Sequence, residues 1–111
     1  MRFQGKSRLG FYPLPLSEAQ RIRRFLLFPD AAPSSAIDPC VGDGEAFEVI
    51  THHSAEVLRY GIELDAYRAE QARQRIPNIV QGNTLEVQCP VECFGLLYLN
   101  PPLSKRFFSY V

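Results

Sequence analysis

Two short stretches of this 111-residue chain carry side chains that could bind a ligand or act on one. The first, residues 37–44, has the order apolar residue, Asp38, loop, Gly42, acid, Gly44, and helix-forming residues follow it. The second places Asn100 before two prolines at the end of another apolar run. Glycine has no Cβ, so it lets the backbone approach a ligand closely. The first stretch therefore predicts a nucleotide-like ligand at the carboxyl end of a parallel strand.

The residues around the glycines indicate which ligand would suit them. A phosphate-binding loop would need a lysine after the last glycine, but Glu45 stands there, and the third glycine of a dinucleotide fingerprint is absent. Asp38 and Asp43 would repel a pyrophosphate and suit a cation. The alternative for this stretch alone is a tight turn in which Asp43 caps a helix.

An acid follows at the distance that a nucleotide site requires. Residues 60–64 read as a second strand, and Glu63 lies about 20 residues after the glycine loop. A carboxylate there can accept both hydroxyl protons of a ribose. Asp65 lies just beyond Glu63, where it could cap the next helix.

In this order, the glycine loop, Glu63 and Asn-Pro-Pro resemble class I S-adenosylmethionine-dependent methyltransferases, particularly the gamma-type DNA adenine-N6 enzymes. The resemblance implies an aromatic-Pro segment that closes over S-adenosylmethionine and a set of cofactor contacts. These residues are Phe11, Tyr12, Pro13, Asp38, Pro39, Cys40, Gly42, Gly44, Glu63, Leu64, Asn83 and Thr84. It implies that the catalytic segment is Asn100, Pro101, Pro102 and Leu103.

The catalytic segment would act on an amine. Two acceptors placed against the N–H bonds of a planar exocyclic amine favour a pyramidal nitrogen and stabilise the charge that develops on it. The Oδ1 atom of Asn100 and the carbonyl of Pro101 match that pair. The family has an aromatic ring where Leu103 stands, and an acid that accepts from the adenine amino group where Asn83 stands.

The resemblance implies N6 methylation of adenine in DNA, in a restriction-modification setting. Guanine-N2 RNA enzymes and protein-glutamine methyltransferases share the Asn-Pro-Pro motif and remain alternatives. A further alternative, from another class, is a non-catalytic remnant or subunit that binds S-adenosylmethionine and acts through a partner.

The elements that would position these residues alternate between helix and strand. Helices are predicted at about 17–28, with Ser17 in a capping box, at 46–58, and at 66–75. Strands are predicted near 36–38, 60–64, 79–81 and 94–99, the last buried on both faces because it is almost continuously apolar. His52 and His53 would fall in the second helix and point in different directions, so no metal site is predicted.

The fold class is therefore α/β, a partial Rossmann-like sheet of about four parallel strands flanked by helices. We divide the chain into an N-terminal arm, residues 1–16, and the N-terminal half of a methyltransferase domain, residues 17–111. The class I methyltransferases that this chain resembles have a sheet of seven strands in the order 3-2-1-4-5-7-6. We therefore expect a truncated piece or one member of an assembly, with a second copy or a partner chain covering the exposed sheet edge.

Composition sets the remaining limits. The formal net charge is zero and 46% of the residues are hydrophobic, which is typical of one small globular domain. No apolar run approaches the ~20 residues of a membrane span, and the N-terminus lacks a signal peptide, so a cytoplasmic location is expected. The three cysteines form no paired motif, and Cys40 is expected to be a small buried residue. The first 24 residues of the chain include six basic ones, and we interpret them as a solvated surface and not as a nucleic-acid contact.

Overall fold

Four parallel strands form the centre of the computed structural model, which describes residues 13–53, 56–89 and 93–100. The strands are β1 (Ser34–Asp38), β2 (Val57–Glu63), β3 (Asn78–Gln81) and β4 (Leu96–Leu97). Their order in the sheet is β3-β2-β1-β4. This order confirms the Rossmann-like α/β fold and the arrangement predicted for its first four strands.

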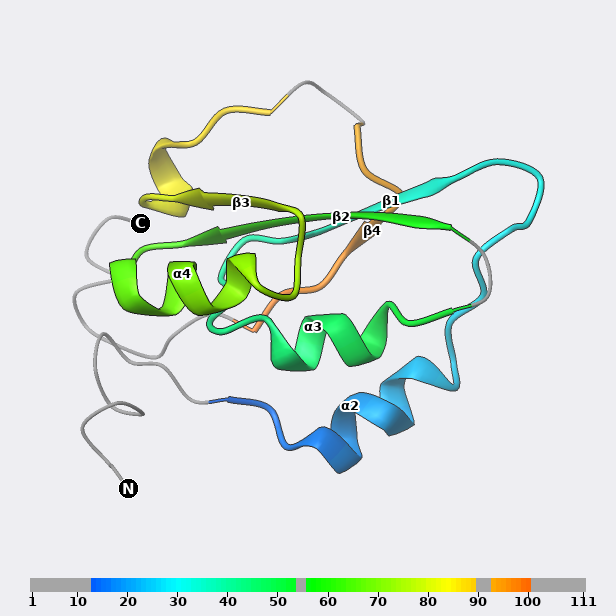
Figure 1. Ribbon diagram of the computed structural model, residues 1–111. Coiled ribbons are helices and arrows are strands. Elements are labelled where there is room, and N and C mark those ends of the chain that lie inside the picture. Colours follow the sequence, from blue (N-terminus) through cyan, green and yellow to red (C-terminus); the bar gives the residue numbers. More distant parts are fainter. Residues whose placement is uncertain (1–12, 54–55, 90–92, 101–111) are drawn as a thin grey trace.

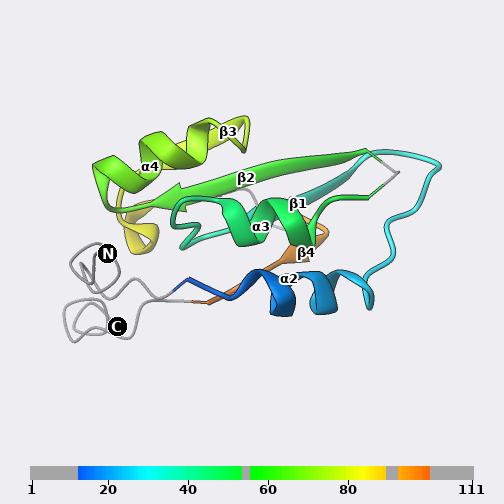
Figure 2. The ribbon, with the colours of Figure 1, turned by 60° about the horizontal axis from the view of Figure 1, so that its bottom comes forward.

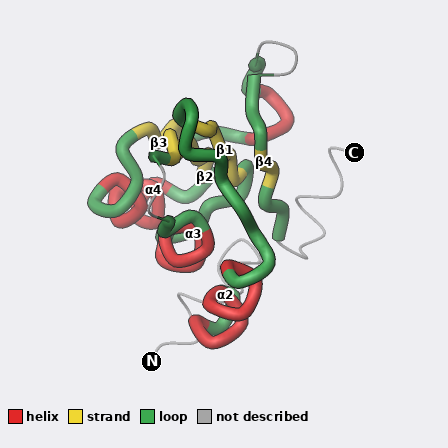
Figure 3. The backbone as a smooth tube through the Cα atoms, turned by 90° about the vertical axis from the view of Figure 1, so that its right-hand side faces the viewer, coloured by secondary structure: helices red, strands yellow, loops and turns green. Residues whose placement is uncertain are grey.

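Three helices cover one face of the sheet: α2 (Leu16–Arg23), α3 (Glu45–Ile50) and α4 (Ala66–Arg73). Figures 1 and 3 show them on the same side, and Figure 2 shows α3 between α4 and α2. Right-handed crossovers from β1 to β2 and from β2 to β3 place α3 and α4 on this face. The core between helices and sheet contains Ala36, Val41, Phe47, Val57, Ala72 and Ile76.

The opposite face of the sheet is more open. The segment after β3, which contains the short 3-10 helix η2 (Thr84–Glu86), crosses this side in Figure 3. Leu58, Val80 and Leu97 remain 40%, 50% and 59% exposed. The prediction that the fourth strand is buried on both faces is therefore wrong for the described residues: Leu96 and Tyr98 pack against the core, while Leu97 does not.

The first helix differs from its prediction at both ends. Pro15 is the N-cap residue, its carbonyl accepts from the amides of Glu18 and Ala19, and no side-chain cap is formed, so the Ser17 capping box is wrong. The helix ends at Arg23 instead of residue 28. Beyond it the chain opens into turns, and Phe28 packs against the core ahead of Pro29, which cannot continue a helix.

The second helix ends at Ile50 instead of residue 58. The hydroxyl of Thr51 donates to the carbonyl of Phe47, and Arg59 donates to both Oγ1 and O of Thr51, so the polar groups at the helix end are satisfied there. Residues 57 and 58 instead belong to β2, where Val57 pairs with Ser34. His52 and His53 consequently lie after the helix and not within it.

The third helix agrees with its prediction to within two residues, and Asp65 caps it by accepting the amide hydrogen of Arg68 at 3.0 Å. The Asp65 cap is confirmed. The N-terminal arm up to residue 12 lies outside the described residues. Within the described part of the chain, no helix has the length and apolar character that a bilayer crossing requires.

Candidate functional site

The carboxyl ends of β1 and β2 carry the first predicted stretch, now folded as a loop between β1 and α3. Gly42 and Gly44 adopt φ values of 61° and 85°, in the left-handed region that favours glycine. A Cβ at Gly44 would lie 3.3 Å from Cγ1 of Ile76 and 3.4 Å from Cα of Ala72. The backbone at Gly44 therefore lies close to α4 and to Ile76, and the lack of a side chain lets the start of α3 pack against them.

Glu63, predicted as a ribose ligand, is joined to the glycine loop. Its carboxylate is 6% exposed, and Oε1 accepts the amide hydrogen of Gly42 at 2.8 Å. The other oxygen, Oε2, accepts the amide hydrogen of Asp65 at 2.9 Å. The carboxylate thus connects the end of β2 to the loop after β1 and to the start of α4. A carboxylate has about four acceptor positions, and the two amides occupy two of them.

Arg68 is a member of this site that the sequence reasoning missed. It lies in α4 and is only 5% exposed, with Nε 3.4 Å from Oε2 of Glu63 and Nη1 4.0 Å from Oδ2 of Asp65. An arginine in a polar helix usually points to solvent, so the residue type did not indicate that Arg68 would be buried in the site. The spacing Glu63, Asp65, Arg68 across a strand–helix junction is the one feature that could have identified it.

Asp38 is the most deeply buried acid among the described residues, at 2% exposure. Its Oδ1 accepts the amide hydrogen of Cys40 at 3.0 Å. Burial raises the pKa of Asp38 to about 7, the Cys40 hydrogen bond opposes that rise, and the negative charge of Glu63 adds to it. Near neutral pH this carboxyl is therefore divided between its neutral and charged forms.

Two neighbours of Asp38 respond to the same environment. Burial raises the pKa of Cys40 to about 12, with the charges of Asp38 and Glu63 adding to the effect. A thiol with so high a pKa is a poor nucleophile. The expectation that Cys40 is a buried residue is met only in part, because the residue is half-buried. Burial also raises the pKa of Tyr98, with a contribution from Asp38, which places Tyr98 near this carboxyl. Sequence reasoning did not single out Tyr98.

Three of the predicted cofactor-binding residues, Asn83, Thr84 and Leu64, lie after or at the end of a strand, and the first two make hydrogen bonds within the chain. Oδ1 of Asn83 accepts the amide hydrogen of Leu85 at 2.9 Å and caps η2. The hydroxyl of Thr84 donates to the carbonyl of Pro39, which ties this connection to the loop after β1. Leu64 is 44% exposed at the end of β2. Asn83 and Thr84 are thus brought to the glycine-loop edge of the sheet, with their first hydrogen bonds already made inside the chain.

Asn100 lies at the same edge because β4 pairs with β1. Ile37 is level with Leu97, and the amide of Tyr98 donates to the carbonyl of Ile37 at 3.0 Å. Asn100 follows two residues later and is exposed. Pro13 is exposed as well. Five other predicted positions lie outside the described residues: Phe11, Tyr12, Pro101, Pro102 and Leu103.

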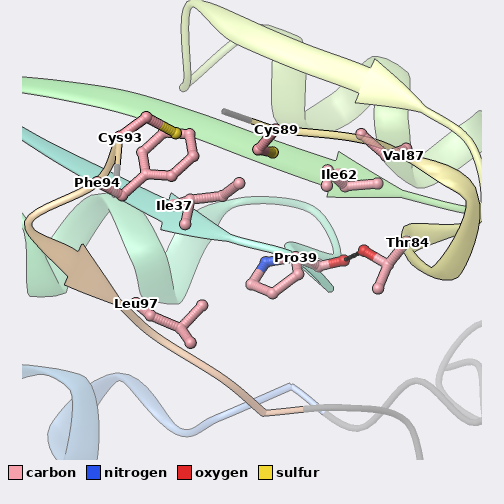
Figure 4. A pocket seen from close by; sticks show the side chains of 9 residues that line it. All are labelled: Ile37, Pro39, Ile62, Thr84, Val87, Cys89, Cys93, Phe94 and Leu97. Atoms are coloured by element: carbon pink, nitrogen blue, oxygen red, sulfur yellow. Dashed lines mark hydrogen bonds between the residues drawn. The ribbon is translucent and has the colours of Figure 1, made fainter. Parts of the chain in front are cut away.

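An apolar cleft of about 340 Å³ opens on the sheet face away from the helices. Figure 4 shows side chains from β1, β2, β4 and the connection after β3 around it. It is lined by Ile37, Pro39, Ile62, Thr84, Val87, Cys89, Cys93, Phe94 and Leu97. Pro39 and Thr84, both predicted cofactor contacts, lie at one end of it. This cleft could not be predicted from the sequence, because it forms only where the connection after β3 folds over the sheet.

The electrostatic character of the edge bears on which ligand it could hold. Three acids are buried there, Asp38, Glu63 and Asp65, against the single buried cation Arg68 among the described residues. Such a site disfavours the phosphates of ATP or NAD and favours a ligand that carries positive charge. In the described part of the chain, no group of three or more His, Cys, Asp or Glu residues could hold a metal ion.

Comparisons with known proteins agree with this fold. The methyltransferase subunit of the type I restriction-modification system from Streptococcus thermophilus superposes on 90% of this chain, with a TM-score of 0.66 and 20% sequence identity. This chain covers 26% of that subunit. The comparison with curated proteins gave no match. Residues 1–107 match DUF6094, described as an uncharacterised methyltransferase family. The match spans almost the whole chain, and the protein accordingly belongs to this methyltransferase family.

Proposed function

We propose that this chain carries an S-adenosylmethionine-dependent N-methyltransferase site whose substrate is the N6 amino group of adenine in DNA. The observation that carries the proposal is the adjacency of β1 and β4. It brings the loop that follows Asp38 and the residue Asn100 to one edge of the sheet, where Glu63 also ends β2.

The residues of this edge fit the cofactor. S-adenosylmethionine supplies a methyl group on a positively charged sulfur, which an amine can attack in line. In our proposal Glu63 accepts from the ribose hydroxyls with its remaining acceptor positions, and Asp38 provides negative charge near the sulfonium. Leu64, 44% exposed beside Glu63, offers an apolar surface to the adenine ring.

The transfer step would be the task of the segment that begins at Asn100. Its Oδ1 would accept one N–H of the target amine, and the carbonyl of Pro101 the other. These acceptors would orient the nitrogen lone pair toward the methyl group and stabilise the positive charge that develops on nitrogen. No general base is required before the bond forms, because the attacking amine is neutral.

The choice of DNA adenine rests on two supports. The motif order, with the glycine loop before Asn-Pro-Pro, is that of the gamma-type adenine-N6 enzymes. The structural neighbour is a subunit of a restriction-modification methyltransferase. We further propose that a partner chain or a second copy covers the exposed sheet edge at β4, where Leu97 and Leu99 are exposed.

A non-catalytic role is the second candidate, and two observations favour it. Both oxygens of Glu63 already accept hydrogen bonds within the chain. The Oδ1 atom of Asn83, the proposed adenine acceptor, is likewise engaged with Leu85. In this case the chain would keep the fold and act through a partner.

Methyl transfer distinguishes the two candidates. The protein would be incubated with S-adenosylmethionine labelled in its methyl group and with DNA that contains adenine, and the digested DNA would be examined for N6-methyl-2′-deoxyadenosine. The proposal predicts labelled N6-methyl-2′-deoxyadenosine, its loss in Asn100→Ala, and unchanged cofactor affinity in that variant. Cofactor binding without any transfer to DNA, RNA or protein would favour the non-catalytic role.

A further inference from the structure

Buried charge at the carboxyl edge of the sheet is not balanced. Among the described residues four charged side chains are buried, at 2% to 7% exposure: Asp38, Glu63, Asp65 and Arg68. All four lie at the ends of β1 and β2 or at the start of α4. Buried charges are costly unless they are paired. One cation for three acids leaves this part of the molecule with negative charge that no described side chain offsets.

Arg68 forms ion pairs with the other two buried acids. The guanidinium lies 3.4 Å from Glu63 and 4.0 Å from Asp65. These two acids also accept backbone amide hydrogens, Glu63 from Gly42 and Asp65, and Asp65 from Arg68. Hydrogen bonds and a cation therefore offset the cost of burying these two side chains.

Asp38 has a different set of neighbours. Its Oδ1 accepts the amide hydrogen of Cys40 at 3.0 Å, and the nearby charge that acts on it is the negative charge of Glu63. From β4, the half-buried hydroxyl of Tyr98 is close enough to respond to the charge on Asp38. Neither the loop, β2 nor β4 supplies a cation to Asp38 from the described residues. With no cation beside Asp38 among the described residues, a cationic ligand or a proton retained on the carboxyl would compensate for its burial.

We propose that Asp38 is the residue by which this site distinguishes the sulfonium cofactor from its demethylated product. Asp38 releases a proton to solvent when a cationic ligand binds beside it and keeps that proton when a neutral ligand binds. The inference rests on the proposed function and extends it to product release. Once the methyl group and its charge have left, the site holds a neutral thioether beside a carboxyl that prefers to be protonated, and its affinity falls.

The magnitude of the effect follows from ordinary electrostatics. Burial places the pKa of Asp38 at about 7, so the carboxyl is near half-protonated at neutral pH. A positive charge within ~4–6 Å lowers the pKa of an acid by about 1–3 units. Binding of the cation at pH 7 should therefore release about 0.4–0.5 proton. The same coupling should strengthen binding about five- to tenfold between pH 6 and pH 8.

The test compares three ligands of similar shape that differ in the charge they carry at the position of the sulfur. S-adenosylmethionine carries the sulfonium, sinefungin carries a cationic amine at the same place, and S-adenosylhomocysteine carries a neutral sulfur. The amino-acid and nucleoside parts are common to all three. Calorimetric titrations of the unmodified chain in phosphate and in Tris, whose ionisation enthalpies differ, report the protons released on binding. We expect release with the first two ligands and almost none with S-adenosylhomocysteine.

Asp38→Asn tests the residue, because asparagine keeps the shape and an acceptor for the Cys40 amide but cannot ionise. The variant should show equal, near-zero proton release with all three ligands and a pH-independent affinity for S-adenosylmethionine. Asp30→Asn, which removes an exposed acid from the turn before β1, should retain the behaviour of the unmodified chain.

Two results would overturn the inference while leaving the proposed function intact. One is equal proton exchange with S-adenosylmethionine and S-adenosylhomocysteine in the unmodified chain. The other is undiminished release in Asp38→Asn. If that variant does not fold, the three-ligand comparison still decides, because it uses the unmodified chain. Absence of binding by all three ligands would overturn the proposed function and this inference together.

Discussion

The amide of Gly42 donates a hydrogen bond of 2.8 Å to Oε1 of Glu63, which lies 21 residues further along the chain. This bond fixes the glycine loop after β1 against the end of β2. A loop already held in place loses less conformational entropy when a ligand binds. Glu63 is thus a structural residue of the loop as well as the proposed ribose acceptor, and the two roles can be separated by substitution.

Replacing Glu63 should affect stability in proportion to what the new side chain retains. Glu63→Ala leaves the Arg68 guanidinium buried without this partner and two amides without their acceptor, so we expect a loss of about 3–5 kcal/mol in the free energy of unfolding. Glu63→Gln keeps one acceptor oxygen, and its loss should be about 1–3 kcal/mol. Urea unfolding measures both.

Glu70→Ala is the matched control on α4. Glu70 pairs with Arg73 at 3.1 Å, but both side chains are largely exposed, so the change should cost less than about 1 kcal/mol. A Glu63→Ala variant as stable as Glu70→Ala would contradict the structural role of Glu63.

Gly44 should be intolerant of a side chain for two reasons that add. Its φ of 85° is unfavourable for other residues by about 1–2 kcal/mol, and a Cβ would meet Ile76 at 3.3 Å. Gly44→Ala should therefore lower the free energy of unfolding by at least that amount. Gly82→Ala is the control, because a Cβ there meets nothing within 4 Å. Equal stability of the two alanine variants would show that the loop conformation differs from the one described.

Asp38 should make the protein less stable as the pH rises. The folded chain keeps the Asp38 proton up to about pH 7, whereas the unfolded carboxyl loses it near its ordinary value of 3.8. Between these values the folded chain binds more protons, so the free energy of unfolding falls as pH rises and levels off above about 7. The total effect is on the order of 4 kcal/mol.

The comparison with Asp38→Asn isolates this contribution from the other titrating groups. Unfolding free energies of both proteins would be measured by urea at pH 4, 5.5, 7 and 8.5. The variant should gain stability relative to the unmodified chain as pH rises, with the largest difference at pH 8.5. A difference that stays constant across the series would mean that Asp38 is ionised throughout.

The sheet order was expected from the resemblance to class I methyltransferases, whereas the positions of Asp38, Glu63 and Asn100 could be predicted because they depend on local patterns. Apolar runs that end in an acid, a glycine pair or Asn-Pro-Pro mark the carboxyl ends of strands. Asp65 was predicted as a cap for the same reason, since capping depends on residues three positions apart. These features need no knowledge of distant contacts.

The features that the sequence did not predict depend on contacts between distant residues. The second helix ends at Ile50 because Arg59, eight residues beyond Thr51, donates to its backbone and hydroxyl oxygens. The burial of Arg68 depends on where α4 lies over the ends of β1 and β2. The apolar cleft depends on the connection after β3, which Thr84 fastens to Pro39. Composition and periodicity carry no information about such contacts.

The most direct test of the account is a calorimetric titration of this chain with S-adenosylmethionine, with ATP and NAD as controls. Circular dichroism of the same sample establishes that the chain is folded. The account predicts saturable binding of S-adenosylmethionine and no binding of ATP or NAD, because the buried acids of the carboxyl edge repel phosphates. A folded chain that fails to bind S-adenosylmethionine, or that binds ATP or NAD as well, would contradict the assignment of this edge as a sulfonium site.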